Sequence, residues 1–247
     1  MPRTGDEVER LGETLNEMLT RLEAALERER DFVADAGHEL RTPLALLRTE
    51  LELALRHAES PEEVREAVRW ASQEAARLSQ LADDLLLIAR SDRGKLPLRI
   101  ETLDAGQLFA TVVSRFEWQA EDAGRPLESD APPSVRLSGD RLRLEQALAN
   151  LVDNALRHGG GRVRLAVAGA DGRVELHVQD QGPGFPPEFL DGAFERFSRP
   201  EAGRAGGGSG LGLSIVKAIA EAHGGTAHAV NSPDGGADVW LVLPTAP

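Results

Sequence analysis

The sequence predicts a chain of two parts with different fold classes, an all-α helical hairpin followed by an α+β sandwich. Up to about residue 90, apolar residues recur at the three- and four-residue spacings of packed helices. Beyond Pro97, helical segments alternate with short segments that have the two-residue period of strands. The helical pattern stops near Ser91-Asp92-Arg93-Gly94, where a linker is expected.

The composition is that of a globular protein with an acidic surface. The 247 residues are 41% hydrophobic, and 41 acidic against 28 basic side chains give a net charge of -13. This charge repels nucleic-acid phosphates and anionic membrane surfaces, so no nucleic-acid partner is expected. Cysteine is absent, which excludes disulfides and thiolate sites. No apolar run reaches the roughly 18 residues of a membrane span and no signal peptide opens the chain, so a cytoplasmic location is expected.

The hairpin is predicted from two apolar stripes. The first follows a coiled-coil seam through Leu11, Leu15, Met18, Leu22, Ala25, Glu29 and Phe32, changes phase after Ala36, and continues through Leu40, Leu44, Leu47, Leu51, Ala54 and Ala58. Ser60-Pro61-Glu62-Glu63 predicts the start of a second helix, with a capping serine and proline at the first helical position. Its stripe runs through Val64, Ala71, Ala75, Leu78, Leu85 and Ile88. Because two helices bury too little surface alone, we expect a homodimer that forms a four-helix bundle.

The second part is predicted to mix helices and strands. Strands are expected at residues 98–102, 162–168, 174–180, 226–230 and 237–243, and helices at about 104–120, 140–158 and 211–222. The two strands around Asp171-Gly172 predict a hairpin. The stretch 182–210 has little regular signal, and so long a loop in a compact domain indicates a mobile lid over a ligand. This mixture predicts helices on one face of a mixed sheet.

His38 is the first candidate for chemistry. It lies roughly 200° around the helix from the seam, so its ring should face solvent. Pro43 lacks an N–H group and crowds the carbonyl of Glu39, so the helix should bend or loosen there. Glu39 is then placed to hydrogen-bond one ring nitrogen and leave the other nucleophilic, while Thr42 shares the histidine's face. A lone surface histidine is more often inert, and a zinc site is excluded because a metalloprotease helix needs histidine where Thr42 stands.

Two asparagines mark one face of the helix expected at 140–158. Asn150 and Asn154 are four residues apart, and Arg157 lies beside the second. An unsatisfied buried amide costs on the order of 1–3 kcal/mol, so such a pair indicates a partner. Amide carbonyl oxygens suit Mg²⁺, which binds a few oxygen ligands together with water and phosphate.

Two glycine-bearing segments complete the candidate set. Asp180-Gln181-Gly182-Pro183-Gly184 ends a predicted strand, where a carboxylate can accept a hydrogen bond from the amino group of adenine but is repelled by the guanine carbonyl. ATP should therefore be preferred to GTP, although an ordinary Asp/Gly turn is the alternative. Residues 206–213, ahead of a helix that contains Lys217, expose backbone amides that suit phosphate. A P-loop is excluded because no Gly-Lys-Ser/Thr occurs, and the dinucleotide fingerprint because the glycines do not follow the first strand of a βαβ unit.

In this order, the segments resemble the motifs of bacterial sensor histidine kinases of two-component systems. Residues 38–44 look like the phosphoacceptor box, 150–158 the N box, 180–184 the first glycine box, 194–197 the F box and 206–213 the second glycine box. Asp6-Glu7 with Leu11, Asn16, Met18 and Leu19 resembles the second helix of a HAMP linker. The resemblance covers the chain from His38 to Leu213 with specific motifs.

The resemblance implies three parts: a HAMP-like signalling helix over residues 1–28, a dimerisation and phosphotransfer domain over 29–92, and a Bergerat-type ATP-binding domain over 93–247. It implies ATP-dependent autophosphorylation of His38 and transfer of the phosphate to an aspartate of a response regulator receiver domain. Thr42 would position water for the reverse reaction, dephosphorylation of the regulator. The parent protein would reach the membrane only through a sensor region absent from this chain.

The resemblance also assigns the site. Glu39 would orient and deprotonate the ring of His38, Asn154 would coordinate Mg²⁺, and Asp180 would bind adenine. The remaining positions expected to bind ATP are Asn150, Arg157, Gly182, Gly184, Gly208, Gly210, Leu211 and Gly212. Two alternatives stay open: another ATPase of the same nucleotide-binding superfamily, such as a chaperone or repair clamp, and a non-enzymatic dimeric scaffold. Periodicity does not report whether phosphorylation acts within or between subunits.

Overall fold

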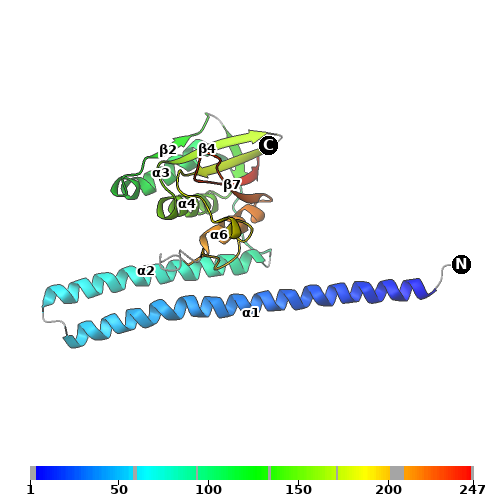
Figure 1. Ribbon diagram of the computed structural model, residues 1–247, viewed down its shortest axis with the longest axis horizontal. Coiled ribbons are helices and arrows are strands. Elements are labelled where there is room, and N and C mark those ends of the chain that lie inside the picture. The colour runs from blue at the N-terminus through cyan, green and yellow to red at the C-terminus, as the bar shows by residue number, and fades with distance from the viewer. Residues whose placement is uncertain are drawn as a thin grey trace. The chain divides into compact units, whose positions relative to one another are not determined.

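A computed structural model describes residues 4–57, 60–92, 94–132, 135–170, 172–200 and 209–245 (Figure 1). Within these ranges, the side chains of residues 4–9, 11, 21, 24, 25, 28 and 170 are not described. The chain divides into two compact units, Met1–Leu81 and Ala82–Pro247. No helix in the described ranges is both long and apolar enough to cross a bilayer.

The first unit contains the predicted hairpin. Helix α1 spans Thr4–His57 and helix α2 spans Pro61–Asp92, the last turns of which belong to the second unit. The start of α2 is as expected, because the N–H of Glu63 donates to Ser60 Oγ at 3.2 Å. Helix α1 continues through Pro43, so the loosening expected beside His38 does not interrupt the helix.

The hairpin buries one face of α1 only partly. Leu40, Leu47, Leu51 and Ala54 of the predicted stripe are half-buried, whereas Leu44 is 52% exposed. Pro43, three residues after Leu40, is half-buried as well. The change of phase near Ala36 therefore leaves Leu44 on the margin of the face that one copy of the chain covers.

The second unit contains a five-stranded sheet of order β2-β4-β5-β7-β6. Its strands are β2 (Leu127–Asp130), β4 (Val163–Ala170), β5 (Arg173–Gln179), β7 (Ala237–Pro244) and β6 (Thr226–Asn231). Strands β2 and β4 pair in parallel and the other neighbours pair antiparallel, so the sheet is mixed as predicted. The hairpin of β4 and β5 is confirmed. A separate antiparallel pair joins β1 (Glu101–Asp104) to β3 (Arg136–Gly139).

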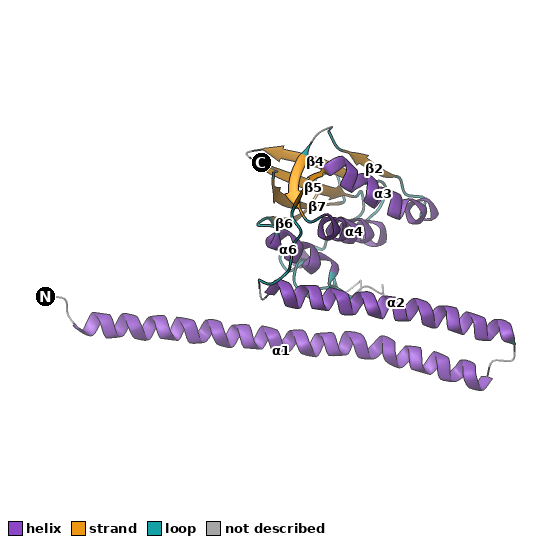
Figure 2. Ribbon diagram, turned by 180° about the vertical axis from the view of Figure 1, so that it is seen from behind, coloured by secondary structure: helices purple, strands orange, loops and turns teal. Residues whose placement is uncertain are grey.

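Helices α3 (Ala105–Asp122), α4 (Arg141–His158) and α6 (Gly212–Ala222) cover one face of the sheet, as Figure 2 shows. Along β5 the side chains of Val174, Leu176 and Val178 are buried, and the alternate positions are half-buried or exposed. This period of two is the pattern of a sheet with helices on one face. The predicted α+β sandwich is therefore confirmed, and in the described residues of the loop that follows β5 the one helix is the short α5 (Pro187–Leu190).

Two details of the strands differ from the expectation. The strand expected at 98–102 lies instead at Glu101–Asp104, because the N–H of Arg99 donates to Asp140 Oδ2 at 2.7 Å. Strands β2 and β3 were not predicted. Strand β2 reads Leu-Glu-Ser-Asp, which has a single apolar residue, and it forms by pairing with β4 far along the chain.

Candidate functional site

Helix α4 carries the asparagine pair and is fixed at its start by Asp140. The carboxylate of Asp140 accepts the N–H of Arg143 at 3.1 Å and the N–H of Arg99 at 2.7 Å. Burial opposes ionisation of Asp140, but these two donors and the positive charge of Arg143 hold its pKa below the ordinary value. The N–H of Asp140 donates to Nε2 of His223 at 2.9 Å, and the Nδ1 of that ring lies 2.7 Å from the carbonyl of Ile219. The start of α4 is thus tied to the end of α6.

The packing of α4 against α6 brings the asparagine face to the glycine-rich segment. Asn150 Nδ2 donates to the carbonyl of Gly212 at 3.4 Å. Asn154, one turn further along α4, is half-buried beside the core residues of the helix. Arg157 is exposed and forms an ion pair with Asp153 at 2.8 Å. The structure therefore joins two of the predicted motifs, and Arg157 lies at the surface beside them.

Asp180 lies where β5 ends and is only 9% exposed. Its Oδ1 accepts the N–H of Gly182 at 2.7 Å and that of Gly160 at 3.4 Å. A side chain on Gly182 would place Cβ 2.4 Å from the nitrogen of Gly160, so both backbones approach too closely for any residue but glycine. Asp180 and Gly182, which the sequence predicted as a pair, both contact Gly160, which was not among the predicted site residues.

Gly160 belongs to the turn Gly159-Gly160-Gly161, which follows α4 directly. A Cβ on Gly159 would lie 2.4 Å from Cγ of Asp180. The N–H of Gln181 donates to the carbonyl of Gly160 at 2.8 Å. The run of three glycines directly after a helix is the sequence signal that could have identified this turn, because glycines permit close approach of two backbones.

Asn231 is a second residue that the sequence analysis missed. Its Oδ1 accepts the N–H of Phe185 at 2.7 Å and its Nδ2 donates to the carbonyl of Phe185 at 2.8 Å. Gly184, just before Phe185, has φ +74° and leaves room for the side chain of Asn231. The first glycine segment is thereby attached to the end of β6.

Phe197, near the middle of the segment predicted to form a lid, lies against Gly210 at its end. A Cβ on Gly210, which has φ +69°, would lie 2.7 Å from the carbonyl carbon of Phe197. Phe197 itself has φ +57°, a conformation that is rare for a bulky residue. Leu211 is fully buried, and its carbonyl accepts the N–H of Ile215 at 2.9 Å in the first turn of α6. Gly208 lies outside the described residues.

These residues suit a magnesium nucleotide. Among the described residues, no group of three histidine or carboxylate side chains is arranged to hold a metal ion alone. A cation at Asn154 would therefore need oxygen ligands from phosphate and water, which is the coordination that Mg²⁺ prefers. The glycine contacts around Asp180 leave backbone N–H groups close to the carboxylate, without side chains to cover them.

The phosphoacceptor candidate lies on the hairpin. His38 is exposed as predicted, and Glu39 is half-buried. Thr42 Oγ1 donates to the carbonyl of His38 at 3.3 Å, so the threonine is next to the histidine on the helix. The side chains of neighbouring residues point about 100° apart around a helix axis. A hydrogen bond between the carboxylate of Glu39 and the ring of His38 therefore stays a prediction.

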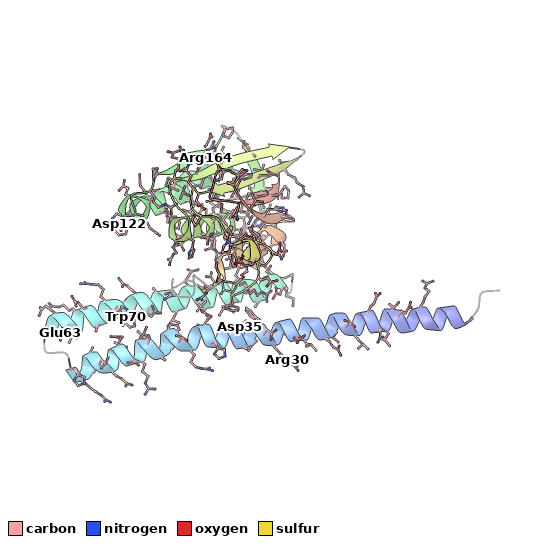
Figure 3. The ribbon with its side chains drawn as sticks, viewed as in Figure 1. Arg30, Asp35, Glu63, Trp70, Asp122 and Arg164 are labelled. Carbon is pink, nitrogen blue, oxygen red and sulfur yellow. The ribbon has the colours of Figure 1, made fainter. Side chains whose placement is uncertain are left out.

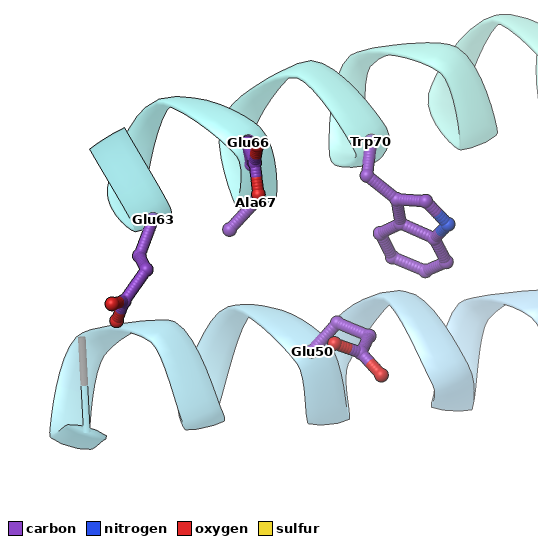
Figure 4. A pocket seen from close by; sticks show the side chains of 5 residues that line it. All are labelled: Glu50, Glu63, Glu66, Ala67 and Trp70. Carbon is purple, nitrogen blue, oxygen red and sulfur yellow. The ribbon is translucent and has the colours of Figure 1, made fainter. Parts of the chain in front are cut away.

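A groove of about 300 Å³ lies between α1 and α2, lined by Glu50, Glu63, Glu66, Ala67 and Trp70 (Figure 4). Trp70 and Glu63 of α2 point toward α1, and Glu50 belongs to α1. Three carboxylates repel a polyphosphate, so this groove is not the nucleotide site.

The sandwich holds the asparagine, aspartate and glycine residues that would bind a nucleotide, and two family models match the chain. The model described as histidine kinase-, DNA gyrase B-, and HSP90-like ATPase matches residues 139–247. The model described as His Kinase A (phospho-acceptor) domain matches residues 28–94. The signal transduction histidine-protein kinase BaeS of Escherichia coli K12 is 38% identical over an alignment of 251 positions, which covers 98% of this chain and 52% of BaeS.

Solved structures of histidine kinases are similar to this chain as well. The histidine kinase AdeS of Acinetobacter baumannii has a TM-score of 0.72 at 28% identity, over 85% of this chain and 98% of AdeS. ShkA, solved in complex with AMPPNP, has a TM-score of 0.67 at 28% identity, over 88% of this chain and 46% of ShkA. ThkA, solved in complex with the response regulator TrrA, shares the fold with a TM-score of 0.67 at 23% identity, over 97% of this chain and 64% of the matched one.

The chain therefore belongs to the sensor histidine kinases of two-component systems. It spans about half the length of the relatives that it matches.

Proposed function

We propose that this chain is a histidine kinase core that phosphorylates His38 with ATP and passes the phosphate to an aspartate of a response regulator. The observation that carries the proposal is the pairing of an exposed His38, inside a matched phosphoacceptor domain, with a matched ATPase domain in the same chain. Neither domain alone would support the transfer.

The nucleotide would bind where α4, α6 and the end of β5 supply polar groups. Asp180 would accept a hydrogen bond from the adenine amino group, and the lid glycines would surround the phosphates. Asn154 would hold Mg²⁺, with Asn150 beside it on α4. When bound, the cation would neutralise charge on the phosphate oxygens. The AMPPNP complex of ShkA supports an adenine nucleotide as the ligand.

The transfer step balances without any further reactant. A ring nitrogen of His38 attacks the γ-phosphorus, an N–P bond forms, and the bond from that phosphorus to the β,γ-bridging oxygen breaks to release ADP. The ring proton passes to Glu39. An aspartate oxygen of the regulator then attacks the same phosphorus, the N–P bond breaks, and the ring takes a proton back from Glu39, which regenerates His38. The rate would come mainly from in-line positioning and charge stabilisation.

The partners follow from the same proposal. A second copy of the chain would cover the apolar stripes of the hairpin and complete a four-helix bundle, and a monomer at micromolar concentration would contradict this. A receiver domain would dock near His38 to receive the phosphate, and the complex of ThkA with TrrA supports a response regulator as the partner. Regulator dephosphorylation aided by Thr42, a HAMP-like role for residues 1–28 and a membrane-anchored parent stay predictions.

Incubation with γ-labelled ATP and Mg²⁺ tests the proposal. The wild type should gain protein-bound label that acid removes, and His38→Ala should abolish it. His57→Ala is the matched control, because His57 is also an exposed histidine of α1, and it should label normally. Asn154→Ala should lose labelling while it keeps the far-ultraviolet circular dichroism of the wild type.

Label that persists in His38→Ala would contradict the proposal, and an unlabelled wild type would favour a nucleotide-dependent scaffold. Nucleotide hydrolysis without any protein-bound label would favour an ATPase that uses ATP to change shape.

A further inference from the structure

Arg125 joins three parts of the sandwich that surround the nucleotide site. It follows α3 in the sequence Ala123-Gly124-Arg125-Pro126. Gly124 has φ +62°, and the N–H of Arg125 donates to the carbonyl of Ala120 at 2.9 Å. This glycine-terminated helix end fixes the backbone of Arg125 at the second position beyond the cap.

The guanidinium of Arg125 binds the end of α4. Its Nη1 donates to the carbonyls of Ala155 at 2.7 Å and Leu156 at 2.9 Å, and its Nε donates to the carbonyl of Gly161 at 2.8 Å. The last carbonyls of a helix have no partner within it, and a positive charge there is favourable. One side chain thus joins the last turn of α4 to Gly161, the last residue of the glycine turn.

The same turn contacts Asp180 from its other side. The N–H of Gly160 donates to Asp180 Oδ1, and the carbonyl of Gly160 accepts the N–H of Gln181. The residue before Ala155 is Asn154. Arg125 therefore acts on the proposed adenine and magnesium residues through one intervening segment, without itself belonging to a nucleotide motif.

Stability alone is an incomplete explanation for this arrangement. The second terminal nitrogen of Arg125, Nη2, is buried and has no hydrogen-bond partner in the part of the chain that the structure describes. A buried donor without a partner costs free energy, and most buried polar atoms in proteins are paired.

We propose that Arg125 is a positioning residue that sets nucleotide affinity and the preference for adenine, by holding the turn Gly159-Gly160-Gly161 against Asp180. The proposal rests on the nucleotide site described under the proposed function. Without the guanidinium, the turn moves away from Asp180, and the carboxylate loses the N–H of Gly160 that fixes its direction.

Binding of Mg·AMPPNP and Mg·GMPPNP to the full chain, measured by titration calorimetry, tests this role. Arg125→Gln should weaken AMPPNP binding about ten-fold, since hydrogen bonds to a charged group are involved, and should lower the ratio of AMPPNP to GMPPNP affinity. Arg125→Lys keeps the charge, but its single ammonium group cannot bond three carbonyls as the forked guanidinium does. Its affinity for AMPPNP should therefore lie between those of the wild type and Arg125→Gln. Arg164→Gln is the matched control and should bind like the wild type, because Arg164 of β4 (Figure 3) forms an exposed ion pair with Asp130 of β2.

The outcomes separate the two proposals. Wild-type affinity in Arg125→Gln, or equal losses for both nucleotides with an unchanged ratio, would overturn the positioning role and leave the nucleotide site intact. A wild type that binds neither nucleotide would overturn the nucleotide site and the positioning role together. Should Arg125→Gln not fold, Arg125→Lys carries the comparison, and hydrogen exchange at the amide of Gln181 should then be faster than in the wild type.

Discussion

The hairpin and the sandwich differ in whether one copy of the chain closes the apolar core. In the sandwich, Phe109, Leu165 and Leu241 are completely buried. In the hairpin, Met18 and Val68 are 62% and 58% exposed. Burial of apolar surface is the main force in folding, so the sandwich has what it needs to fold alone. The hairpin leaves a stripe of apolar side chains exposed. Such a stripe suits a part of the protein that binds a partner surface.

Truncation of one leucine in each region should reveal the largest difference in stability between the sandwich and the hairpin. Leu176→Ala, in the closed core of the sandwich, should lower the free energy of unfolding by about 2–5 kcal/mol. Leu55→Ala is the matched change in the hairpin, where Leu55 is 86% exposed, and it should cost no more than about 0.5 kcal/mol. Guanidinium denaturation followed by circular dichroism measures both. Equal losses would mean that the hairpin core is closed as well.

Asp140 tests a second difference, because among the described residues the buried carboxylates lie in the sandwich. Its pKa is lowered, so the stability it contributes is present above the ordinary value of about 3.9 and is lost as the pH falls through the pKa of the folded state. Asp140→Asn should cost about 1 kcal/mol at neutral pH and less in acid. Asp122→Asn, at the end of α3 (Figure 3), is the control. A cost that does not change with pH would show that charge is not the cause.

The smallest effect is expected on the face of the sheet away from the helices. The ring of His177 stacks on Trp240 at 5.3 Å between centroids and lies 3.0 Å from Asp238. Burial opposes its protonation, but the carboxylates of Asp238 and Glu175 raise the pKa of His177 above the ordinary value. The contribution to stability is therefore complete below about pH 6.5 and is lost as the pH rises through the pKa of the folded state.

His177→Gln should accordingly cost less than about 1 kcal/mol, and only on the acid side of that window. A double-mutant cycle with Asp238→Asn, measured by thermal unfolding at two pH values, isolates the pair. Coupling that grows at high pH would contradict the assigned sign.

Several parts of the sequence were sufficient for prediction because their signals are local. Asp140 precedes an apolar period of 3.6 residues, and α4 begins at the next residue. Asp171-Gly172 between two alternating segments predicted the pairing of β4 with β5. The solvent-facing position of His38 followed from helical spacing alone.

The remaining features depend on segments far apart in the chain. Strand β2 has no alternation of its own and exists because β4 offers an edge. Arg125 reaches α4 because α3 ends at a glycine turn, and Asn231 meets Phe185 because β6 closes the sheet beside the first glycine segment. A local sequence pattern does not encode contacts between segments that are so far apart in the chain.

The two fold classes, the helix that carries His38 and the residue types of the proposed nucleotide site could be predicted from the sequence. Only the tertiary structure decided how those residues are held: Asp180 by the glycine turn, Asn150 by Gly212, and the turn itself by Arg125. The reason is physical. Periodicity and capping act over one or two turns of chain, whereas the direction of a polar side chain depends on which backbone groups packing brings within hydrogen-bonding distance.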